Sequence, residues 1–148
     1  MSQTTYNEKA PRALPGMLGD VGADLHIRSY GLEGGGEFGL FVVPGTDPEK
    51  EVAVPSVGGV VVGCIVHQHP LYDESLSDLA DGETAQVLTK GRAWVQTAEP
   101  VAPGDTVYVE DATGKIRNDA TAATELPSSK IEAYDAGTTL ALVSVNLP

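Results

Sequence analysis

Glycine and proline interrupt this chain at intervals that are too short for long helices. The sequence holds 17 glycines and 10 prolines in 148 residues. Proline breaks a helix interior and glycine weakens one, so this spacing favours short strands joined by tight turns. The length fits one domain with a real hydrophobic core, and the 41% of hydrophobic residues is too high for a disordered chain. We therefore expect an all-β fold, a small β-barrel or sandwich.

The net charge, the cysteine count and the length of the apolar runs argue against several classes of function. The net charge is −12, which disfavours nucleic-acid binding through phosphates and binding to an anionic membrane surface. The single cysteine excludes an intrachain disulfide framework and a cysteine-based zinc site. The longest apolar run is far shorter than a membrane span, and the N-terminus is polar. We expect a soluble protein that is made inside a cell.

The first thirty residues differ from the rest of the chain. Residues 1–30 carry no net charge, whereas residues 31–148 hold 6 basic and 18 acidic residues and so carry the whole −12. Prolines and glycines in this segment prevent a helix or a regular ladder. Interleaved apolar residues nevertheless need a surface to cover: Leu14, Met17, Leu18 and Val21. We expect an extended N-terminal arm, lying on its own domain or on a partner, ahead of one β-rich domain over 31–148; a loose terminus is the alternative.

From residue 30 onward the pattern predicts eight or nine short strands. The expected strands are residues 38–43, 51–54, 60–69, 85–90, 92–96, 106–110, 116, 130–134 and 138–147. The strand over 106–110 alternates, with Val107 and Val109 on one face. Residues 71–82 are the one possible helix, and a surface loop is the alternative.

One pattern suggests a metal site. His67 and His69 would project from the same face of a strand, and Glu74 follows after four residues. This stretch resembles the first metal motif of cupins, and residues 101–107 resemble the turn that opens their second motif. That second motif should supply another histidine downstream, but the only other histidine of the sequence is His26, in the arm. Two histidines at a strand end without a metal are the alternative, and we expect no cofactor.

Other catalytic patterns are absent or point to structural roles. Cys64 lies in an apolar run, where a thiol is normally buried and inert. No serine stands in a nucleophile elbow, and the glycine-rich stretch 31–37 lacks the lysine of a phosphate loop. We interpret that stretch as a flexible hinge between the arm and the body. The sequence therefore favours a binding or structural module over an enzyme.

Three stretches, in this order, resemble the structural cement or head decoration proteins of tailed bacteriophages. They are the proline–glycine arm over residues 13–20, residues 82–95, and residues 101–109 with the small residues and the closing strand that follow. The resemblance implies a β-tulip or jelly-roll-like domain without catalytic residues. It also implies a virion protein on the outer surface of the expanded capsid, assembled in the host cytoplasm, that clamps neighbouring major capsid subunits against the pressure of the DNA.

We expect the arm to make the capsid contact, through Leu14, Pro15, Met17, Leu18 and Val21, by adding a strand to a sheet edge on the shell. The expected partners are the major capsid protein and further copies of this chain, as a homotrimer or alternatively a dimer. The second hypothesis is a carbohydrate-binding or adhesion module, with Trp94 and Tyr108 as stacking platforms. A cupin-like metalloenzyme is the third.

Overall fold

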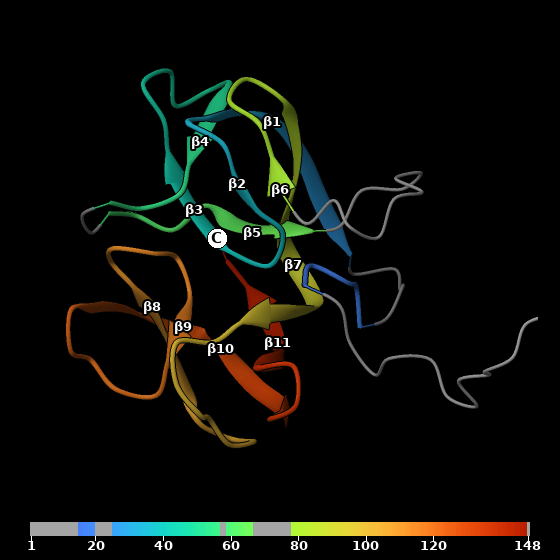
Figure 1. Cartoon of the computed structure of the whole chain (residues 1–148), viewed down its shortest axis with the longest axis vertical. Coiled ribbons are helices and arrows are strands. Elements are labelled where there is room, and N and C mark those ends of the chain that lie inside the picture. The colour runs from blue at the N-terminus through green and yellow to red at the C-terminus, as the bar shows by residue number, and fades with distance from the viewer. Residues whose placement is uncertain (1–14, 20–24, 57–58, 67–77, 148) are drawn as a thin grey trace, which may run out of the picture.

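All regular elements in the described part of the chain are strands (Figure 1). The computed structural model describes residues 15–19, 25–56, 59–66 and 78–147. The strands are β1 (His26–Glu33), β2 (Gly36–Glu37), β3 (Phe41–Pro44), β4 (Glu51–Ala53), β5 (Gly63–Val66), β6 (Asp78–Leu79), β7 (Thr84–Gln96), β8 (Thr106–Glu110), β9 (Ile116–Arg117), β10 (Ala123–Asp135) and β11 (Leu140–Asn146). The all-β prediction is confirmed. No helix among these residues has the length and apolarity that crossing a bilayer requires.

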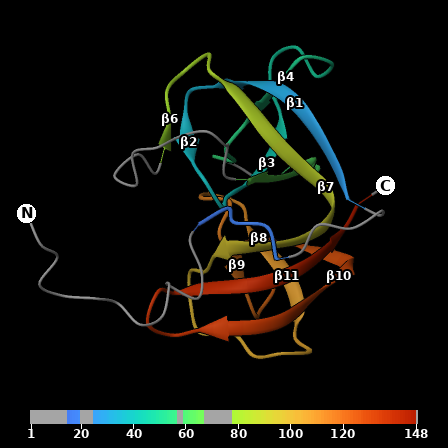
Figure 2. The same ribbon diagram turned by 90° about the vertical axis from the view of Figure 1, so that its right-hand side faces the viewer.

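Strand β7 runs through both halves of the molecule (Figures 1 and 2). Its first half pairs with β1 on one edge and with β5 on the other. Strand β4 pairs with β1, and β3 pairs with both β4 and β5. The five strands β1, β4, β3, β5 and β7 therefore close into a barrel. Side chains on the inner faces of these strands fill the barrel together with Phe38, which lies between β2 and β3; the largest on the strands are Leu32, Val42, Val52, Ile65 and Val87. The predicted barrel is therefore present.

The second half of β7 starts a separate stack of strands. It pairs with β11, which is followed by β10, β8 and β9. An isolated bridge between Thr97 and Ile116 places β9 beside the end of β7. The main apolar cluster lies inside this half, and Phe41 of β3 and Cys64 of β5 join it from the faces of their strands that point away from the barrel interior. The two halves thus share one long strand, while the barrel interior and the second half have separate apolar clusters.

Several local predictions can be compared with the structure. The predicted alternation in β8 is confirmed, since Val107 and Val109 are buried and the other three residues are half-buried. The two strands expected on either side of Gly91 are one strand, β7. The hinge expected over residues 31–37 is wrong. Those residues form the end of β1, a tight turn and β2, because turn glycines let the chain reverse inside the barrel domain.

Candidate functional site

The described part of the arm lies against its own domain. The amide of Gly16 donates to the carbonyl of Trp94, that of Gly19 donates to the carbonyl of Arg92, and that of Trp94 donates to the carbonyl of Met17, each at 2.8 Å. Leu18 forms an antiparallel bridge with Ala93. On the same edge of β7, the arm follows directly beyond β1, which pairs from Lys90 to Thr84. Residues 15–19 therefore extend β1 along β7, while β11 occupies the opposite edge (Figure 2).

Two glycines allow the arm to lie this close. Gly16 is buried and has a φ of 76°, a conformation that a side chain disfavours. At Gly19, a Cβ atom would lie 2.5 Å from Cδ1 of Leu142 and 3.1 Å from Cβ of Arg92. The Pro-Gly-Met-Leu-Gly stretch, which carried part of the family resemblance, is thus explained by docking onto β7 and β11.

The arm covers an apolar cluster on the outer face of the second half. Met17 packs with Trp94, Leu140 and Leu142 there, whereas Leu18 packs against the main core. Trp94 is only 5% exposed. The interpretation of Trp94 as a stacking platform for sugars is therefore wrong, because the arm and β11 cover its ring. Tyr108, the other suggested platform, is half-buried on β8.

The remaining predicted site residues divide into two groups. Leu14 and Val21 of the arm, and the suggested metal ligands His67, His69 and Glu74, lie outside the described residues. No group of three potential metal ligands occurs within the described ranges. Cys64 is fully buried in the main apolar cluster, and this burial raises the pKa of its thiol far above the usual value. A thiol in that state is not a nucleophile.

An arginine holds the outer loops of the second half together, which sequence patterns did not indicate. The guanidinium of Arg117 on β9 bonds a carboxylate oxygen of Glu110 at 3.0 Å and one of Asp119 at 3.2 Å, and lies 3.5 Å from Glu99. The bond from Arg117 lowers the pKa of Glu110, with help from Thr113. It also lowers the pKa of Asp119, together with the backbone amide of Thr121. This network is structural, because each of its charges is already partnered.

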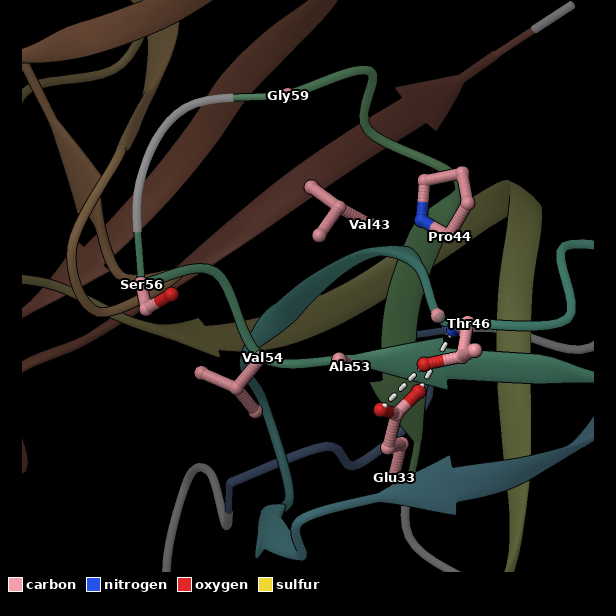
Figure 3. A pocket seen from close by; sticks show the side chains of 9 residues that line it. Glu33, Val43, Pro44, Thr46, Ala53, Val54, Ser56 and Gly59 are labelled. Carbon is pink, nitrogen blue, oxygen red and sulfur yellow. Dashed lines mark hydrogen bonds between the residues drawn. The ribbon is translucent and has the colours of Figure 1, made fainter.

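A groove of about 440 Å³ lies on the outer face of the barrel, and it was also missed (Figure 3). Glu33, Ala53 and Val43 stand side by side on β1, β4 and β3, in direct register. Their neighbours Leu32, Val52 and Val42 point into the barrel and are fully buried. The groove is also lined by Pro44, Gly45, Thr46, Val54, Ser56 and Gly59. It therefore has apolar walls and one carboxylate.

Thr46 fixes the carboxylate of Glu33 at the edge of this groove. The amide of Thr46 donates to Oε2 at 2.7 Å, and its hydroxyl donates to Oε1 at 2.8 Å (Figure 3). These two bonds, the backbone one first, lower the pKa of Glu33. Gly45 permits the approach, since a Cβ atom there would lie 2.6 Å from Oε2. The carboxylate is therefore charged, exposed and held in one place.

A family model described as "Structural cement protein (E217 gp24/Pam3 gp6)" matches residues 2–146. The chain belongs to this family. The resemblance found in the sequence is thereby confirmed, and the cement protein is a phage structural protein. A chain in a solved structure described as "The capsid of Myoviridae Phage XM1" has the same fold, with a TM-score of 0.72 and 17% identity over 95% of this chain and 97% of that chain. No curated protein matches this cement protein.

Proposed function

We propose that the protein binds the outer surface of an expanded phage head and clamps neighbouring major capsid subunits, so that the shell withstands the pressure of the packaged DNA. The observation that carries this proposal is the family match over residues 2–146. The net charge of −12 supports an outward position, because mutual repulsion keeps a densely covered particle soluble. In this role the protein performs no catalysis, and it binds neither nucleic acid nor membrane.

The arm remains the proposed contact with the capsid. Ordering a free arm costs roughly 1–2 kcal/mol per residue of backbone entropy. Residues 15–19 are already held by hydrogen bonds to β7, so they bring the arm to the shell without that cost. Of the five proposed contact residues, Pro15, Met17 and Leu18 are half-buried in the docked arm and keep part of their surface for a partner. Leu14 and Val21 complete the proposed set.

Several copies acting together would strengthen a shallow contact. We propose a homotrimer at threefold positions of the shell, with a dimer at twofold positions as the alternative. In such an assembly each further arm binds at the high local concentration that the first arm creates. The protein would be assembled onto heads in the host cytoplasm and remain on the virion.

Co-sedimentation with shells tests the proposal. Purified protein is mixed with expanded, undecorated heads and, as the control, with unexpanded procapsids. We expect saturable binding to the expanded heads alone, and the saturation ratio gives the copy number and hence the symmetry. A well-folded sample that sediments with neither particle would refute the cement function.

A further inference from the structure

The groove beside Glu33 is a second surface suited to a partner. Its floor is Ala53, whose small side chain stands between those of Val43 and Glu33 in one row across three strands (Figure 3). Pro44 and Val54 extend the apolar wall. Next to Gly59, at the rim, Val60 is 78% exposed, far more than any other large apolar residue in the described part of the chain. One exposed valine is ordinary by itself, but beside the apolar lining of the groove it enlarges the apolar surface that a partner can cover.

The charges around the groove define what it can accept. Asp81 lies close enough to influence Glu33 and accepts a hydrogen bond from the amide of Gly34 at 2.8 Å. Glu51 accepts one from the amide of Asp47. The nearby Lys50 is paired with Asp47 at 3.8 Å. The field at the mouth of the groove is therefore negative, and an occupant with a positive charge is favoured.

The bonding of Glu33 favours an ammonium over a guanidinium. Each carboxylate oxygen already accepts one hydrogen bond from Thr46. A bidentate arginine needs both oxygens presented together in a matching fork, whereas a lysine head is a point charge that can approach one oxygen. The aliphatic stem of a lysine would lie over Ala53 and against Val43, since lysine buries its stem along apolar surface.

We propose that this groove receives a lysine side chain from an exposed segment of the major capsid protein, with its ammonium on Glu33 and its stem on Ala53. This inference rests on the proposed cement function. The segment would also cover Val60. The groove contact is electrostatic and thus sensitive to salt, unlike main-chain pairing by the arm.

Shell binding by matched variants tests the groove. Glu33→Gln removes the charge and keeps an oxygen for Thr46, while Ala53→Leu fills the floor from the outer face of the sheet. Glu125→Gln, at an exposed residue on β10, is the control for loss of one negative charge. We expect the first two variants to bind expanded heads about three- to tenfold more weakly at low salt, and the control to bind like the wild type. The effect of Glu33→Gln should shrink at high salt.

A carbodiimide cross-link adds a direct readout, because this reagent joins a carboxylate to a contacting amine. We expect a peptide containing Glu33 joined to a capsid lysine in the wild type, and no such product from Glu33→Gln. Equal binding by all variants, with no Glu33 cross-link, would overturn the groove proposal and leave the cement function standing. Absence of wild-type binding would overturn both. Thermal unfolding of each variant confirms that it is folded.

Discussion

Replacement of Gly16 by alanine should release the arm without unfolding the domain. The φ of 76° at Gly16 lies in the left-handed region, where a non-glycine residue costs about 1–2 kcal/mol. The arm is held locally, by its backbone bonds to β7 and by half-buried Met17 and Leu18. The strain therefore acts first on arm docking, and 1–2 kcal/mol lowers the ratio of docked to released arm by roughly 5- to 30-fold.

Amide hydrogen exchange measures this release at the bonds themselves. The amides of Gly16, Gly19 and Trp94 are protected by the arm–β7 pairing. In the variant, the amides of residue 19 and Trp94 should exchange roughly 5- to 30-fold faster. Amides of Val143 and Val145 on β11 should change little, because β11 pairs with the other edge of β7.

A matched glycine separates arm release from general strain. Gly34 also has a positive φ, 81°, and apart from its chain neighbours no atom of the described residues lies within 4 Å of where its Cβ would be. Gly34→Ala thus introduces similar strain in the turn after β1, far along the chain from the arm. It should leave exchange at Gly19 and Trp94 as in the wild type. Equal acceleration in both variants, or none in Gly16→Ala, would refute the role of this glycine in docking.

Three further predictions concern stability and binding. Trp94→Ala should destabilise the protein by about 3–5 kcal/mol in urea unfolding, because it removes the centre of the cluster under the arm; a loss below about 1 kcal/mol would contradict that packing. Arg117→Ala should lower the melting temperature more near pH 7 than near pH 3. Because Arg117 lowers the pKa values of Glu110 and Asp119, its bonds to them stabilise the fold fully above the ordinary carboxyl range, and this stabilisation disappears as the pH falls through the lowered values. An equal loss of melting temperature at both pH values would contradict this role of the two carboxylates. Removal of residues 1–24 spares β1, whereas removal through residue 28 also deletes three residues that pair with β7. The shorter deletion should therefore leave a folded barrel with a red-shifted Trp94 emission and no affinity for expanded heads. Unchanged affinity would contradict the arm contact.

Local chemistry made much of the fold predictable from sequence. Alternating valines predicted β8 and its buried face, and the strand predicted at residue 116 is β9, which pairs with β8. Sequence alone did not show that β7 is continuous, because a glycine such as Gly91 weakens a strand and therefore predicted two shorter strands. The structure shows β7 gaining new partners on both edges at this point, with the arm and β11 beyond it. Such long-range pairing leaves no local pattern.

The candidate site was predictable only in part, for a similar reason. The composition of the arm showed that its apolar residues need a surface, and the structure supplies that surface on β7. The groove joins Glu33, Val43 and Ala53, which are ten residues apart along the chain and adjacent only through the β1–β4–β3 register. The first half of β10 was missed because Pro127 and two serines resemble a loop, although they form an irregular step within the strand.

The proposed contacts of the arm and of the groove would place different demands on a shell. Because the arm and β11 occupy both edges of the second half of β7, a capsid strand has no edge of β7 to join there. A partner must pair with the arm itself or contact its exposed side chains, and backbone pairing distinguishes poorly between sequences. The groove is more selective than the arm, because it has one fixed charge in an apolar row. A partner must place a particular side chain at a particular distance to fill it. Specificity for one capsid would then come from the barrel, and much of the binding strength from the arm.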